Sequence, residues 1–159
     1  MQISIFEPKF NQAVIDLILT IQQEEFLLPI FLTEQPDLLD IENSYQKQGG
    51  QFWVAINERK EVLGCIGLVA LEQDNVALKK MFVSKNYRKA GLGKELLKAF
   101  VAYCQKEQKK AIFLGTTTDF EAAQHFYRKF GFQAIESSNL PADFPRLAVD
   151  NRFYTYVIN

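Results

Sequence analysis

The stretch VALKKMFVSKNYRKAGLGKELLKAFVAYC, residues 76–104, decides the fold of this chain of 159 residues. It opens with an apolar run at 76–83, which is typical of a strand. A turn that contains two glycines follows at 88–93. The apolar side chains after the turn recur at helical spacing, namely Leu92, Leu96, Ala99, Phe100 and Tyr103. The stretch therefore predicts a strand, a turn and an amphipathic helix, in that order.

The rest of the chain alternates between helical and strand patterns. The predicted helices cover 9–24, 36–48 and 121–129, and the predicted strands cover 51–57, 62–71, 111–117, 132–136 and 152–158. The first two strands form a hairpin, and the strand, helix and strand of 76–117 predict a right-handed parallel crossover in a mixed sheet. Because no repeat, low-complexity tract or linker interrupts the pattern, we expect a single domain, residues 1–159.

The composition is that of a folded globular protein, with 48% hydrophobic residues. A formal net charge of -1 argues against general binding to nucleic acid or to an anionic membrane. The N-terminus has no basic patch followed by an apolar run, so we expect no signal peptide. The two cysteines, Cys65 and Cys104, show no pairing pattern, which favours a reduced, cytoplasmic chain with both as small core residues. His125, the only histidine, is expected at the surface.

The charge is unevenly distributed along the chain. Residues 1–48 carry eight acids against two bases, whereas residues 79–110 carry ten bases against two acids. One interpretation is that these are ordinary solvated helix faces. The sharper one is that the first region meets a cation and the second an anion. We expect Lys79 and Lys80 to send one side chain to solvent at each face of their strand.

The turn at 88–93 has the features of an anion site. A glycine turn that leads into a helix leaves backbone N–H groups without partners, and the helix dipole adds positive charge there. Gly91 and Gly93 lack a Cβ and allow close approach of a ligand. Three bases surround the turn: Arg88, Lys89 and Lys94. The alternative is a tight turn with solvated bases. The spacing matches neither a P-loop nor a dinucleotide-binding motif.

Two motifs stand about 30 residues apart. The first is Arg88-x-x-Gly91-x-Gly93, shortly after Met81-Phe82-Val83, and the second is Ala123-x-x-Phe126-Tyr127-x-x-x-Gly131-Phe132. Together they resemble motifs of the GNAT superfamily of N-acetyltransferases. The resemblance covers nearly the whole order of elements. It implies an α/β (α+β mixed) fold with a twisted, mixed and mostly antiparallel sheet of about six to seven strands, splayed into a V and flanked by about four helices.

The resemblance also implies a donor site for acetyl-CoA, with no metal. The backbone of Met81, Phe82 and Val83 would bind the pantetheine arm, and Phe126 would contact the cofactor. The pyrophosphate would lie on N–H groups of the turn: Arg88, Lys89, Ala90, Gly91, Leu92, Gly93 and Lys94. Tyr127 would be the general acid toward the departing thiolate, since a phenol can donate a proton to sulfur. The alternative for Tyr127 is a core aromatic residue.

The general base and the acceptor site are less defined. Residues 76–83 contain no acid, so the glutamate that some relatives carry there has no counterpart. Glu25 or Glu72 are the candidate bases, with Glu24 and Asp74 nearby in sequence. The candidate acceptor-binding residues are Glu25, Phe26, Phe31 and Phe144, and Trp53 is a further apolar candidate. Ordinary surface acids are an equally good explanation of the acidic N-terminal segment.

The sequence therefore predicts an N-acetyltransferase that moves an acetyl group to a primary amine by direct attack in a ternary complex. The acceptor is a small-molecule or peptide amine, with no nucleic acid or membrane as partner, and a homodimer is common among similar proteins. A non-catalytic acyl-CoA-binding sensor of the same fold is the main alternative. A basic-patch protein that binds RNA is a weaker one. The identity of the acceptor stays open.

Overall fold

The computed structural model describes all of the chain, Met1–Asn159, and contains one sheet of seven strands. The strands are β1 (Gln2–Ile5), β2 (Gln51–Ile56), β3 (Val62–Ala70), β4 (Asn75–Val83), β5 (Ala111–Thr116), β6 (Gln133–Ile135) and β7 (Arg152–Val157). Their order in the sheet is β1-β2-β3-β4-β5-β7-β6. The pair β4–β5 is parallel, whereas β1–β2, β2–β3, β5–β7 and β6–β7 are antiparallel. The expected mixed, mostly antiparallel sheet is confirmed.

Four α-helices accompany the sheet, as expected: α1 (Asn11–Leu19), α2 (Ile41–Ser44), α3 (Leu92–Lys106) and α4 (Glu121–Phe130). Short 3₁₀ turns cover Pro8–Phe10, Leu32–Glu34, Pro36–Leu39, Gln46–Gln48, Glu72–Asp74, Lys85–Ala90 and Ser137–Asn139, and a π-helical turn covers Thr20–Glu25. None of the helices is both long and apolar enough to span a membrane.

Three local predictions differ from the structure. The helix expected at 9–24 ends in the π-helical turn, in which the N–H of Phe26 donates to the carbonyl of Ile21 at 3.1 Å. The single helix expected at 36–48 is wrong, because Asp40 leaves the helical region with φ -151° and ψ 82°, and its carboxylate accepts from the N–H of Asn43 at the start of α2. Strand β1 was not predicted, because only four residues carry it and it lies at the edge of the sheet.

The chain divides into two compact units. The N-terminal unit comprises Met1–Val69 and Lys79–Phe100, and the C-terminal unit comprises Ala70–Leu78 and Val101–Asn159. Strand β4 and helix α3 therefore each contribute residues to both units. The single domain expected from the sequence stays a prediction.

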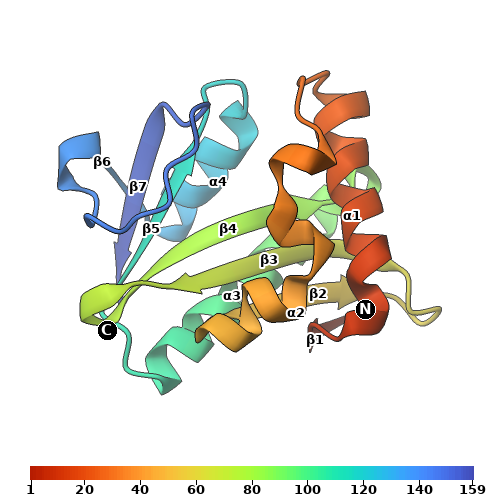
Figure 1. The fold of residues 1–159 in the computed structure, drawn as a ribbon, viewed down its shortest axis with the longest axis horizontal. Helices are drawn as coiled ribbons and strands as arrows, with labels where there is room; N and C mark the ends of the chain where they lie inside the picture. Colours follow the sequence, from red (N-terminus) through yellow and green to blue (C-terminus); the bar gives the residue numbers. More distant parts are fainter. The chain divides into compact units, whose positions relative to one another are not determined.

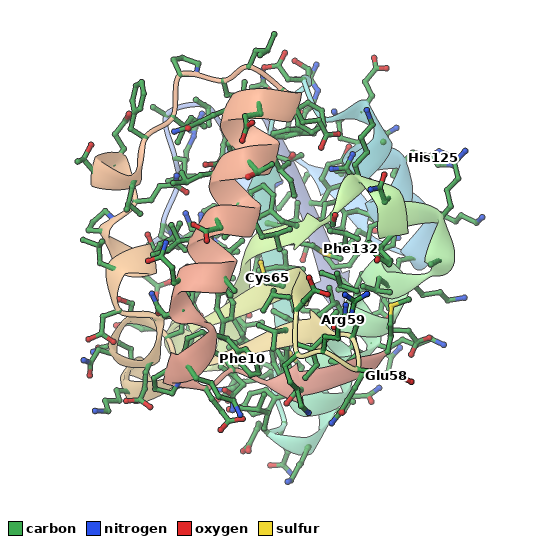
Figure 2. The ribbon with its side chains drawn as sticks, turned by 90° about the vertical axis from the view of Figure 1, so that its right-hand side faces the viewer. Phe10, Glu58, Arg59, Cys65, His125 and Phe132 are labelled. Atoms are coloured by element: carbon green, nitrogen blue, oxygen red, sulfur yellow. The ribbon has the colours of Figure 1, made fainter.

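In the N-terminal unit, strand β2 buries both of its faces. Phe52, Val54 and Ile56 join the core cluster of α1 and α2, while Trp53 on the opposite face packs against Phe100 of α3 with ring centroids 5.7 Å apart. Figure 1 shows α1 and α2 on one side of β2 and β3 and α3 on the other. Phe10 and Cys65 belong to the same cluster and lie beside α1 in Figure 2. Trp53 is therefore a core residue.

In the C-terminal unit, β5 pairs with β7 over six residue pairs, from Ala111↔Val157 to Thr116↔Arg152. Helix α4 lies beside these strands (Figure 1), and the hydroxyl of Tyr154 donates to Gln124 of α4 at 3.1 Å. His125 points outward from α4 in Figure 2 and is exposed, as expected. The start of β4 pairs with β5 from Asn75↔Ala111 to Ala77↔Phe113. The V-shaped splay beyond these pairs involves both units and stays a prediction.

Candidate functional site

The glycine turn before α3 has the backbone of an anion site. Gly91 lies in the left-handed region with φ 82°, and α3 begins at the next residue, Leu92. The carbonyl of Gly91 accepts from the N–H of Glu95 at 3.1 Å. The N–H groups of residues 92–94 lie before this bond, at the end of the helix where N–H groups have no partner within the helix. A Cβ at Gly91 would meet no atom within 4 Å, so its backbone conformation, rather than lack of space, explains the glycine there.

The bases around the turn differ in their surroundings. Lys85, Lys89 and Lys94 are exposed. The guanidinium of Arg88 donates through both terminal nitrogens to the carboxylate of Glu25, and its Nε donates to the carbonyl of Val83 at 3.0 Å. The charge of Arg88 is therefore paired within the N-terminal unit, and the exposed Lys89 and Lys94 supply further positive charge at the turn.

Glu25 lies at the end of the π-helical turn, where it is held in place by this pair. Hydrogen bonding to Arg88 lowers the pKa of the Glu25 carboxyl below its usual value, against a smaller opposing effect of burial. A carboxylate with a lowered pKa accepts a proton less readily. Glu25 is therefore a weaker base as long as it is paired with Arg88. The ring of Phe26 lies under the Arg88 guanidinium, with its centroid 5.9 Å away.

The strand that leads into the turn contains an unusual residue, Lys80. Its φ of 55° is left-handed, and its side chain is only 12% exposed. Its Nζ donates to Oε1 of Gln35 at 2.6 Å and lies 3.7 Å from Oδ2 of Asp37. Burial lowers the pKa of Lys80, and the Asp37 carboxylate opposes the shift. The expectation that Lys80 reaches solvent is wrong, because its ammonium group has a buried polar partner. Lys79 is half-buried.

The sequence did not reveal the polar residues around Lys80. Gln22 and Gln35 are buried and joined through their amides at 2.8 and 3.2 Å, and the hydroxyl of Tyr45 donates to Asp37 at 2.6 Å. Gln22 lies in the π-helical turn, Gln35 and Asp37 lie at and in the 3₁₀ turn Pro36–Leu39, and Tyr45 follows α2, so no spacing in the sequence relates them. A lysine inside an apolar strand pattern was the one available signal.

Tyr127 and Phe126 lie on α4, in the C-terminal unit. Tyr127 is buried, and its ring packs against Phe126 and Phe132 with centroids 5.5 Å away in each case. Burial raises the pKa of the Tyr127 phenol above its ordinary value, which makes the hydroxyl a weaker acid. The position on α4 is as expected, and the proposed role as general acid stays a prediction.

The remaining candidates are divided between the two units. Glu72 belongs to the C-terminal unit and is exposed, and its backbone N–H donates to Asp143 at 2.8 Å. Phe144 of that unit is buried, whereas Phe31 of the N-terminal unit is 56% exposed. The structure does not place Glu25 and Glu72 in one unit, and the assignment of the base stays a prediction. No three His, Cys, Asp or Glu side chains are grouped to hold a metal ion.

The model of the acetyltransferase (GNAT) family matches residues 15–132, which include the glycine turn and Tyr127. The chain belongs to the GNAT family. Its fold is similar to that of a GNAT-family acetyltransferase from Staphylococcus aureus Mu50, with a TM-score of 0.96, 42% identity and 99% of each chain covered. An acetyltransferase from Streptococcus agalactiae 2603 is 32% identical with a TM-score of 0.91, over 98% of this chain and 97% of that one.

Among curated relatives, N-acetylaspartate synthetase of Xenopus tropicalis is 39% identical over 101 residues. The similarity covers 62% of this chain and 37% of the relative. The chain therefore spans well under two thirds of the length of this GNAT relative, and the relative's activity does not transfer directly.

Proposed function

We propose that the chain is an acetyl-CoA-dependent N-acetyltransferase that acts on a primary amine. The observation that carries the proposal is the turn before α3, where left-handed Gly91 precedes the helix N-terminus and exposed lysines surround it. Backbone N–H groups and positive charge suit a pyrophosphate, which a GNAT donor contains. An acyl-CoA donor therefore fits both the family and the geometry of this turn.

The donor would lie along the end of β4 and on the turn. Backbone groups of Met81, Phe82 and Val83 would bind the pantetheine arm, and N–H groups of residues 88–94 would bind the pyrophosphate. When bound, acetyl-CoA supplies an acetyl thioester. Lys89 and Lys94 would supply positive charge toward the pyrophosphate. Arg88 would contribute less, because its guanidinium is paired with Glu25.

Tyr127 would donate a proton to the departing sulfur. A tyrosine phenol is protonated at neutral pH even at its ordinary pKa, as a proton donor requires. Burial raises the pKa of Tyr127 further, which makes it a weaker acid than free tyrosine. The attacking amine would lose its proton to a carboxylate, directly or through water, with Glu25 or Glu72 as candidates. Because Arg88 lowers the pKa of Glu25, this residue can act as a base only once the pair opens.

The acceptor is a small-molecule or peptide amine, and the acidic segment around Glu24 and Glu34 is suited to attract its positive charge. The name of the curated relative points to an amino-acid acceptor for that protein, which makes amino acids one class to test. A homodimer and a cytoplasmic location are further parts of the proposal. The alternative is a sensor that binds acyl-CoA without turnover.

A thermal-shift experiment tests the donor. We expect CoA and acetyl-CoA to raise the melting temperature of the chain, because ligands that bind only the folded state stabilise it. ATP is the control, because it carries phosphates but no pantetheine arm. Stabilisation by ATP alone, or by none of the three, would contradict both the transferase and the sensor.

A further inference from the structure

We propose that Lys80 is a positioning residue whose buried ammonium group holds its own backbone, within β4, in the left-handed region just before the donor-binding end of the strand. The inference rests on the proposed function for its ligand readout, and on the structure alone for its backbone readout. It assigns a role to a buried charge that neither the donor turn nor the proposed chemistry uses.

The backbone at Lys80 requires support. A non-glycine residue with φ near 55° is uncommon, because the Cβ crowds the neighbouring carbonyl, and such residues persist where the surrounding structure holds them. Lys80 lies in the middle of β4, between Val76–Leu78, which are buried, and Met81–Val83, which are half-buried. The direction in which residues 81–83 leave this point depends on the conformation of Lys80.

The side chain of Lys80 supplies one part of that support. Its Nζ donates to Gln35 at 2.6 Å, and Gln35 is fixed by its amide pair with Gln22. Asp37, 3.7 Å from Nζ, accepts from the hydroxyl of Tyr45 at 2.6 Å. Both partners of the ammonium group are therefore held by a second contact, and the lysine has a defined position.

The backbone carbonyl of Lys80 supplies the other part. It accepts from Sγ of Cys65 at 3.2 Å, and Cys65 on β3 is fully buried. Beyond Val83, the N–H of Ser84 donates to the carbonyl of Leu63 at 2.8 Å, which ties the end of β4 to β3. Residues 81–83 are thus held between the anchored Lys80 and the bond of Ser84, and these are the residues assigned to the pantetheine arm.

A matched pair of variants isolates the backbone role. Lys80→Ala and Lys80→Gly both remove the ammonium group, so Gln35 and Asp37 lose the same partner in each variant. They differ only in the Cβ, which disfavours a positive φ in alanine but is absent from glycine. We expect Lys80→Ala to raise the Kd for CoA about tenfold, and Lys80→Gly to raise it only about twofold, measured by calorimetric titration.

Urea unfolding of the same variants gives a readout that needs no ligand. At an ordinary strand position, a protein with glycine is less stable than the same protein with alanine. At a left-handed position this order of stability reverses. We expect Lys80→Gly to unfold at a higher urea concentration than Lys80→Ala. Equal CoA affinity in the two variants, wild-type affinity in Lys80→Ala, or the ordinary order of stability would each overturn the proposal. If the wild-type chain binds no CoA, the proposed function fails, and the unfolding order still decides whether the backbone at residue 80 is left-handed.

Discussion

Arg88 donates to both carboxylate oxygens of Glu25, and this pair joins the π-helical turn at Thr20–Glu25 to the glycine turn before α3. Glu25 and Arg88 are 63 residues apart in the sequence. One carries the residues expected at the acceptor side, and the other carries those expected to bind the donor. We therefore expect the Glu25 carboxylate and the donor pyrophosphate to compete for the guanidinium of Arg88.

We expect Glu25→Gln to tighten CoA binding about threefold, because the neutral amide competes less for the guanidinium and leaves Arg88 to the pyrophosphate. The measurement is calorimetric titration with CoA. The control is Glu24→Gln, because Glu24 is exposed and next to Glu25 in sequence. Weaker binding in Glu25→Gln, or the same change in the control, would contradict this competition.

The pair also predicts a dependence of stability on pH. The pKa of Glu25 is lower in the folded chain than its ordinary value of 4.5. A carboxyl with a lowered folded pKa stabilises the fold above its unfolded pKa, and this contribution is lost as the pH falls through the folded pKa. We expect wild type to exceed Glu25→Gln in free energy of unfolding at about pH 7, by less than ~1 kcal/mol because both groups are partly exposed.

Urea unfolding at a series of pH values checks this expectation. The difference between wild type and Glu25→Gln should shrink as the pH falls from the ordinary value of 4.5 through the lowered pKa of Glu25. A difference that grows in acid would show that the Glu25 carboxyl is not stabilised in its ionised form.

Gly91 gives a prediction about the turn itself. Because its φ is 82° and no atom would meet a Cβ, Gly91→Ala should cost stability through the backbone alone, about 1–2 kcal/mol. Gly91→Asn is the matched variant, since asparagine tolerates the left-handed region better than alanine. We expect CoA affinity to fall in the alanine variant and to recover largely in the asparagine variant. Equal losses of CoA affinity in the alanine and asparagine variants would contradict this prediction, because the left-handed backbone would then not explain the effect.

Tyr127 separates catalysis from binding. We expect Tyr127→Phe to lower turnover about a hundredfold and to leave CoA affinity nearly unchanged, because the ring packing against Phe126 and Phe132 is kept. Steady-state kinetics and calorimetric titration measure the two quantities. Tyr156→Phe is the control, because Tyr156 is half-buried against Phe132 in the same aromatic cluster. Similar losses of turnover in both variants would remove the case for Tyr127 as the acid.

The sequence predicted the elements that carry their own pattern. Helix α3 was predicted because its apolar stripe is continuous, and Leu92, Leu96 and Phe100 are indeed buried. The helix expected at 36–48 was wrong because one residue with non-helical backbone angles, Asp40, interrupts a weak periodicity and caps a new helix. Short elements with few residues, such as β1, leave too little pattern to detect.

The contacts of the candidate site were less accessible from the sequence. The turn at 88–93 was located through its glycines and bases, but the pairing of Arg88 with Glu25 depends on how distant segments fold together. The same is true of Lys80, whose partner Gln35 is 45 residues away. A charge pattern shows where bases and acids lie along the chain, whereas their partners are set by tertiary structure.

The most direct test of the transferase is release of free thiol from acetyl-CoA in the presence of a panel of primary amines, comprising amino acids, polyamines, aminoglycosides and peptides. We predict thiol release that requires both the chain and one class of amine, with a matching mass increase of one acetyl group on that amine. Tight CoA binding without thiol release for any amine of the panel would contradict the transferase and favour the acyl-CoA sensor.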